Sequence, residues 1–246
     1  MKIAILRLAA LFFLASCSSL YSESFRAASA EDLLAPANIA VLPCISWPTK
    51  HAFANSGSGV YDRTQMEKAC KLYDTFILSS FSGQPFMKGK TPRLIQKALE
   101  IAGKPDLMVQ LPRLMEESAP CEDCQGPLSY FRTTLFQDKG FQNWMIEFKK
   151  ASPHSDALLL PIIFDHLEVK DQDRGLDRAL RSTKIALLLI RTYNDSIQWY
   201  STRVGQTSSV FSSPAEFQWP DWSLVYEQVF IDSLWKDFPG YQIYRD

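Results

Sequence analysis

The sequence predicts an α/β fold of the α+β kind, in which a mixed sheet with a C-terminal antiparallel hairpin is packed by amphipathic helices. Apolar runs of strand length occur at residues 38–43, 156–164 and 185–190. Between the first two runs, apolar residues recur at spacings of three and four, as on the buried face of a helix. Only the turn Tyr193-Asn194-Asp195 separates the third run from a strand that contains Trp199, and so short a connection favours an antiparallel hairpin.

Residues 1–16 have the layout of a secretory signal peptide. Lys2 and Arg7 give it a positive start, residues 8–14 form an unbroken apolar run, and two small residues precede Cys17. The run is too short to span a bilayer as a permanent helix, so we expect the segment to be removed.

The four residues Leu14-Ala15-Ser16-Cys17 resemble the lipobox of bacterial lipoproteins. The resemblance implies cleavage before Cys17, diacylglycerol on its thiol and a further acyl chain, such as palmitate, on its amine. Several acyl chains hold a protein on membrane lipid far more firmly than one. Ser18 resembles the outer-membrane sorting class, because Asp at this position retains enterobacterial lipoproteins on the inner membrane. We therefore expect an outer-membrane anchor on the periplasmic face. The alternative is an ordinary signal peptide with a chance cysteine.

The composition indicates one globular domain without nucleic acid as a partner. The 246 residues are 46% hydrophobic and 13% aromatic, enough for a sizeable core. The formal net charge is -1, and loss of Lys2 and Arg7 with the signal leaves no basic excess for a phosphate backbone. After Cys17 no apolar run is long enough for a transmembrane helix.

The chain is expected to have three parts. Residues 1–16 are the lipoprotein signal peptide, and residues 17–36, rich in Ser and Ala, form a lipidated tether with a root-mean-square reach of about 20–25 Å. Residues 37–246 are expected to form a single periplasmic domain with an insertion near 105–140.

The N-terminal half of this domain is predicted to contain one strand and three helices. The strand lies between Pro36 and Pro43, and a loop follows it. Thr91 and Pro92 supply an N-cap and a first-turn proline, and Gly103 is a stop signal. The helices are expected from Asp62 to Phe81, from Pro92 to Ala102 and around residues 141–148.

The C-terminal half is predicted to hold the centre of the sheet. A long apolar strand, residues 156–164, continues into the alternating residues 165–169, and residues 170–181 are expected to form a solvated loop. Two further strands follow, and residues 222–238 are expected to form a closing helix. The two strands after the loop are expected at residues 184–192 and 197–204.

Four cysteines besides Cys17 favour disulfides in an exported protein. We predict the pairs Cys44–Cys70 and Cys121–Cys124. Cys44 follows the first strand, and Cys70 lies on the apolar stripe of the helix expected to pack on that strand. Cys121 and Cys124 are close under any loop conformation. For this C-x-x-C, a redox pair, half of a metal site and free thiols remain alternatives, although its Pro- and Gly-rich flanks are typical of a loop.

Three segments resemble the periplasmic α/β domain of the curli-secretion lipoproteins and of the TolB amino-terminal domain. They are Ile39-Ala40-Val41-Leu42-Pro43, Ser155-Asp156-Ala157-Leu158-Leu159, and the hairpin from Leu188 to Trp199. The resemblance implies this fold and an envelope-assembly context. It implies no catalytic residue.

Motifs for catalysis or metal binding are weak. No G-x-S-x-G occurs. His166 and Glu168 share one strand face, as two metal ligands or an acid–base pair would, and a half-exposed strand gives the same pattern. The carboxylates of Asp165 and Glu168, or of Asp171 and Asp173, are further pairs, for which their setting favours solvation.

An aromatic cluster near the C-terminus has two interpretations. Phe217, Trp219, Trp222 and Tyr226 are either a ligand platform or core packing around the last helix, which we favour.

The sequence therefore predicts an anchored, non-catalytic interaction or assembly module of the cell envelope. We expect no catalytic residue, metal or cofactor, and an envelope protein as partner. The alternative is a periplasmic enzyme whose site no motif reveals.

Overall fold

The computed structural model describes residues 23–27, 34–47, 63–118, 124, 126–173, 176–211, 216–231, 234–235 and 237–241. The signal peptide, Cys17 and Cys121 lie outside these residues.

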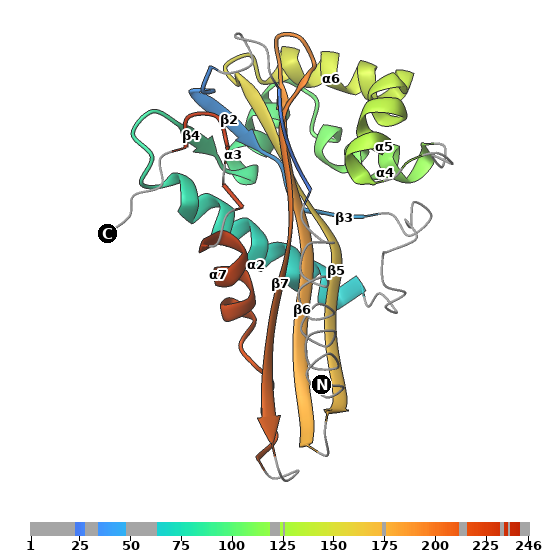
Figure 1. Ribbon diagram of the computed structural model, residues 1–246. Helices are drawn as coiled ribbons and strands as arrows, with labels where there is room; N and C mark the ends of the chain where they lie inside the picture. Colours follow the sequence, from blue (N-terminus) through green and yellow to red (C-terminus); the bar gives the residue numbers. More distant parts are fainter. Residues whose placement is uncertain are drawn as a thin grey trace, which may run out of the picture.

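One mixed sheet organises the described residues, and it confirms the predicted α/β class (Figure 1). Its order is β1-β7-β6-β5-β2-β4, and β3 pairs with β5. β2 is parallel to β4 and β5, whereas β5, β6, β7 and β1 pair antiparallel. The strands are β1 (Ser24–Arg26), β2 (Asn38–Val41), β3 (Ile45–Ser46), β4 (Lys88–Lys90), β5 (Ala157–Asp173), β6 (Leu176–Arg191) and β7 (Ile197–Phe211).

Helices cover both faces of the sheet (Figure 1). One face packs on α2 and α7, and the other packs on α3 to α6. The helices are α2 (Arg63–Phe81), α3 (Pro92–Ile101), α4 (Leu107–Glu117), α5 (Pro127–Thr133), the 3₁₀ turn η2 (Leu135–Gln137), α6 (Lys139–Ala151) and α7 (Trp222–Ile231).

Burial on both faces explains the unbroken apolar runs of the sequence. Leu158 and Leu160 of β5 lie in the core under α3 to α6, whereas Leu159 and Ile163 lie in the core under α2 and α7. Successive side chains of a strand point to opposite faces, so a strand buried twice cannot alternate with polar residues.

The residues predicted to start and end the second helix do so in α3. The Thr91 hydroxyl accepts a hydrogen bond from the Leu94 N–H at 3.3 Å, and Pro92 occupies the first turn of α3. Gly103, with a φ of +69°, lies just beyond the end of this helix.

The predicted hairpin is confirmed. Leu189 of β6 pairs with Trp199 of β7, and Ile190 of β6 pairs with Leu158 of β5. The strand predicted before Pro43 is β2, and it runs parallel to β5.

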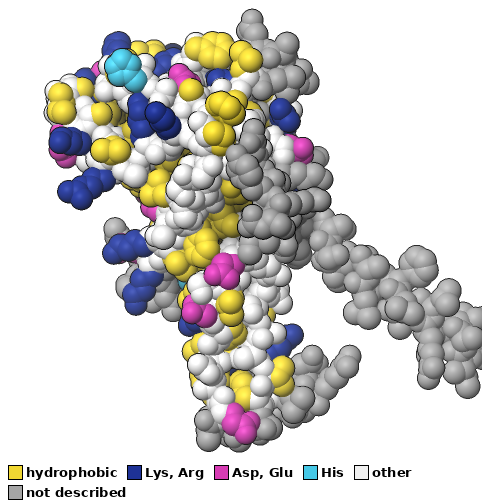
Figure 2. Space-filling view, turned by 90° about the vertical axis from the view of Figure 1, so that its left-hand side faces the viewer, with side chains coloured by type: hydrophobic (Ala, Val, Ile, Leu, Met, Phe, Trp, Pro, Cys, Tyr) yellow, Lys and Arg dark blue, Asp and Glu magenta, His cyan; other side chains and the backbone are white. Residues whose placement is uncertain are grey.

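The prediction of a solvated loop over residues 170–181 is wrong. β5 continues to Asp173, and β6 begins at Leu176. A bulge between Ile163 and Asp165 separates the body of the sheet from a three-stranded extension, seen below the helices in Figure 1 and as a narrow projection in Figure 2. We call this extension the arm; it comprises residues 165–173, 176–184 and 203–211.

Two other boundaries differ from the sequence prediction. Ser24–Arg26, within the expected tether, form β1 on the free edge of β7. α7 ends at Ile231 and not near Phe238. The expected insertion contributes α4 and α5, whose residues join the core under α3 to α6.

Candidate functional site

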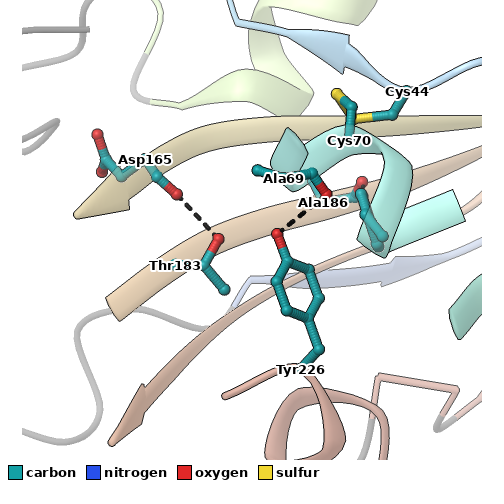
Figure 3. Close-up of a disulfide and its surroundings, with 8 residues drawn as sticks. Cys44, Ala69, Cys70, Asp165, Thr183, Ala186 and Tyr226 are labelled. Carbon is teal, nitrogen blue, oxygen red and sulfur yellow. Dashed lines mark hydrogen bonds between the residues drawn. A yellow bond between two sulfur atoms is a disulfide. The ribbon is translucent and has the colours of Figure 1, made fainter. Parts of the chain in front are cut away.

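A disulfide joins Cys44, which follows β2, to Cys70 on α2, with 5.2 Å between their Cα atoms (Figure 3). This is the predicted pairing, and it fixes the N-terminal strand to the helix that covers it. Cys121 lies outside the described residues, so the Cys121–Cys124 bridge stays a prediction. The Cys124 sulfur lies 3.5 Å from the Thr133 hydroxyl oxygen.

A buried carboxyl group lies one helical turn beyond this disulfide. Burial raises the pKa of Asp74 from 3.8 to about 7, although the backbone N–H of Cys44 donates to this carboxyl and opposes the rise. Within the described part of the chain, Asp74 Oδ1 has no hydrogen-bond partner. No sequence motif marks Asp74; its position four residues after Cys70, next to Tyr73 on the apolar stripe of α2, is the signal that could have identified it.

Three buried hydroxyl groups make hydrogen bonds where α2, α7 and β6 meet. Tyr73 donates to the Ala186 carbonyl at 2.8 Å, and Tyr226 of α7 donates to the Ala69 carbonyl of α2 at 3.3 Å. Thr183 donates to the carbonyl of Asp165 at 2.9 Å, next to Tyr226 in Figure 3. Burial raises the pKa of both tyrosines, so both phenols stay neutral donors.

His166 and Glu168 do lie on one face of β5, as predicted. The imidazole of His166 stacks on the indole of Trp222, with ring centroids 3.6 Å apart. Burial lowers the pKa of His166 to about 4; Glu168 opposes this shift and Arg181 adds to it. His166 is therefore a neutral ring packed on an aromatic side chain at neutral pH.

Glu168 accepts hydrogen bonds from Arg181, its neighbour on the same face of the arm, and from Trp222 of α7. Its Oε1 lies 2.9 Å from Arg181 Nε, 2.6 Å from Arg181 Nη2 and 3.3 Å from Trp222 Nε1. Arg181 Nη1 also donates to the carbonyl of Pro220. These bonds hold the segment before α7 on the arm.

The predicted aromatic cluster completes this contact. We call Phe217, Trp219 and Trp222 the aromatic strip. The Lys170 ammonium lies 3.5 Å from the Phe217 ring centroid, and the Arg181 guanidinium lies 5.6 Å from that of Trp219. The strip packs on arm cations, and Tyr226 lies buried beside it. The cluster thus works as packing that closes the C-terminal segment over one face of the arm.

The other predicted polar groups do not join a common site. Asp165 is buried at the base of the arm, and the side chains of Asp171 and Asp173 lie outside the described set. His154 is exposed, and its carbonyl accepts a hydrogen bond from Lys90 at 2.9 Å. Among the residues that the structure describes, no three His, Cys, Asp or Glu side chains form a group that could hold a metal ion.

An open groove of about 340 Å³ lies between α4 and α6, and no sequence motif predicted it. Its floor includes Trp144, whose Nε1 donates to the Leu107 carbonyl at 2.7 Å. Its rim includes Arg113 and Glu147; hydrogen bonds from Lys104 and Lys150 lower the pKa of Glu147 to about 2. The rim charges are thus engaged with neighbouring side chains.

None of the described helices combines the length and the apolar character needed to cross a membrane. No protein-family model and no curated protein matches the chain.

Several solved structures resemble it distantly. Lipoprotein GNA1162 from Neisseria meningitidis has a TM-score of 0.31 and 10% identity, over 73% of this chain and 89% of that one. The PelC dodecamer from Paraburkholderia phytofirmans has a TM-score of 0.36 and 11% identity, over 91% and 98% of the two chains. The LpoB C-terminal domain from Salmonella enterica has a TM-score of 0.32 and 8% identity, over 70% and 83%. Likeness this weak is no basis for a function.

Proposed function

We propose that this protein is a lipoprotein acylated on Cys17 and anchored to the outer membrane on its periplasmic face. There it serves as a non-catalytic interaction or assembly module of the envelope. The observation that carries the proposal is the sequence Leu14-Ala15-Ser16-Cys17, directly after the apolar run of residues 8–14.

Two features of the domain support this proposal. β1 begins at Ser24, only seven residues after Cys17, so the domain starts close to the proposed lipid. On the face of the arm that the aromatic strip covers, Glu168 accepts hydrogen bonds from Arg181 and Trp222, and Lys170 lies over the Phe217 ring, so these described charges already have partners within the domain.

The anchor is tested with Cys17→Ser in a bacterial host. We expect this variant to lose labelling by radioactive palmitate and partitioning into detergent, because the thiol and the new N-terminus are the acylation points. Ser19→Ala is the matched control and should keep both. A serine variant that still carries palmitate would refute the anchor.

The outer-membrane location is tested with Ser18→Asp in an enterobacterial host. Density-gradient separation of the two membranes should show this variant in the inner membrane. The wild-type chain and the control Ser18→Ala should stay in the outer membrane. Recovery of the wild-type chain in the inner membrane would contradict the proposed location.

The interaction role is tested by photocrosslinking in intact envelopes. A photoreactive residue replaces one exposed apolar side chain at a time: Phe86, Val109 or Leu224, which are 72%, 69% and 52% exposed. A module with a partner should give a discrete crosslinked protein from one of these surfaces and not from all. The absence of any position-dependent product would contradict this role.

A further inference from the structure

The arm has two chemically different faces. Residues paired across an antiparallel ladder lie on the same face, so the register assigns every side chain. The covered face carries His166, Arg181 and Gly205, and it packs on the aromatic strip and α7. We call the opposite side of the arm the open face.

The open face mixes apolar residues with polar and charged ones along its length. Its register pairs include Val169 with Leu180, Lys184 with Val204, and Arg178 with Val210. Val169 is 39% exposed and Val210 is 60% exposed, near the outer end of the arm. Val169 and Leu180 are register partners, and Val210 lies in the next row of the same face, so these three side chains gather near the outer end and do not stand singly.

The core under α3 to α6 does not extend along this face. Its buried cluster ends toward the arm at Phe164, Ala186 and Tyr200. The described helices therefore account for the burial of the sheet body and not for the apolar residues further out.

The N-terminus enters the domain at the base of this arm. β1 is antiparallel to β7, with Ser24 opposite Ser201, and the Thr202 N–H donates to the Glu23 carbonyl at 2.9 Å. β7 runs outward along the arm and β1 runs in the opposite direction, so the N-terminal end of β1 faces the outer end of the arm. The chain at Glu23 therefore points along the arm.

The length of the remaining chain limits where the lipid can be. Cys17 lies six residues before Glu23, and six residues span at most about 20–22 Å. β7 continues from Thr202 to Phe211, a length of about 30 Å at a strand rise of about 3.4 Å per residue. If the chain follows this direction, the backbone of Cys17 reaches at most the level of Ser208, short of the end of β7 at Phe211.

We propose that the outer part of the open face, with Val169, Leu180 and Val210, lies on the lipid surface next to the acylated Cys17. This inference rests on the proposed lipid anchor. The backbone between Glu23 and Cys17 is shorter than the outer part of β7, so a bilayer that holds the acyl chains of Cys17 lies within reach of the outer part of the arm. Valine and leucine side chains then enter the boundary between headgroups and acyl chains, and Ser208 faces the headgroups.

The test places an environment-sensitive fluorophore on a single new cysteine of the full-length acylated protein. Val210→Cys labels the open face, and Leu224→Cys on α7 is the matched control, since both residues are apolar and are 60% and 52% exposed. The proteins are bound to vesicles of phosphatidylethanolamine and phosphatidylglycerol, with or without nitroxide on a fraction of the headgroups. We expect the Val210 label to shift to the blue and to be quenched several times more strongly than the Leu224 label.

The other outcomes overturn the inference in distinguishable ways. If the protein floats with the vesicles but both labels are equally quenched, or neither is, the anchor stands and the open face is not the lipid contact. If the protein does not float, the anchor itself fails and the inference fails with it. If the Val210 label on the non-acylated Cys17→Ser chain shifts with protein concentration in the absence of vesicles, the open face is an interface between copies of the chain.

Discussion

The imidazole of His166 and the indole of Trp222 stack with ring centroids 3.6 Å and planes 17° apart. This contact joins β5 to the first residue of α7. Only the neutral imidazole is favoured there, because burial lowers the pKa of His166 to about 4. The attachment of the C-terminal segment to the arm therefore depends on pH.

We expect His166 to destabilise the fold under acid conditions. Its folded pKa lies below the unfolded value of 6.5, so the unfolded state binds more protons between these values. The stabilisation is complete above the unfolded value and is lost as the pH falls toward about 4, by about 1–3 kcal/mol. His166→Phe keeps a ring on Trp222 and should lose this part of the pH dependence in urea unfolding. Titration of His166 near its unfolded value in an NMR experiment would contradict the prediction.

Asp74 should change stability with pH in the opposite direction to His166. Its folded pKa of about 7 lies above the unfolded value of 3.8, so stability falls as the pH rises between them. Asp74→Asn should therefore unfold at higher urea than the wild-type chain at about pH 8, by about 1–3 kcal/mol, and equal it near pH 4. Asp106→Asn, at an exposed carboxyl, is the control and should change little. Equal stability of Asp74→Asn and the wild-type chain at both pH values would refute the prediction.

Two arginine–glutamate ion pairs have the same N···O distance but differ in burial, so together they test how much burial contributes to stability. Arg181–Glu168 and Arg113–Glu117 both have N···O distances of 2.6 Å, but the side chains of the first pair are 17% and 27% exposed and those of the second 76% and 57%. Arg181→Ala should cost about 1–3 kcal/mol, because Glu168 loses its two guanidinium donors and the Pro220 carbonyl loses a third. Arg113→Ala should change the free energy of unfolding much less, because water screens this exposed pair. Equal losses of unfolding free energy would show that Arg181 does not fasten the segment before α7.

A methyl group at Gly205 should separate α7 from the arm. A Cβ there would lie 2.5 Å from both the Val225 carbonyl oxygen and Val229 Cγ2. Gly205→Ala should therefore lower the free energy of unfolding by about 2–4 kcal/mol. At Gly83 the added carbon meets nothing within 4 Å, so Gly83→Ala is the control. Melting temperatures of the two variants provide the comparison, and an unchanged value for Gly205→Ala would rule out this close approach.

The cysteine pairing has a direct chemical readout. The Cys44–Cys70 bridge has a sequence separation of 26, and its removal by Cys70→Ala should cost about 3–4 kcal/mol. Thiol titration of the mature wild-type chain in denaturant without reductant should find no free thiol, if Cys121 and Cys124 also pair. Two reactive thiols would reject that second bridge, and four would reject both.

Part of the fold follows from local sequence. The apolar runs around Leu158 and Leu188 predict strands, and Thr91 with Pro92 predicts the start of a helix. These signals are reliable because burial and capping act within a few residues of chain. The proposed membrane anchor, by contrast, rests on the four residues that end at Cys17. The tertiary structure shows in addition that β1 begins only seven residues after this cysteine.

The arm and its contacts were decided by the tertiary structure. Residues 170–181 are too polar to predict as strand, and they pair because each ladder bond extends one already formed at Ile163 and Ile185. One face is then covered by the aromatic strip, which lies about forty residues further along the chain. The same reason explains β1, which needs the free edge of β7, and the raised pKa of Asp74, which needs other parts of the fold to bury this carboxyl. Local patterns determine which segments can form strands and helices, whereas contacts between distant segments decide how far they extend and which charges they bury.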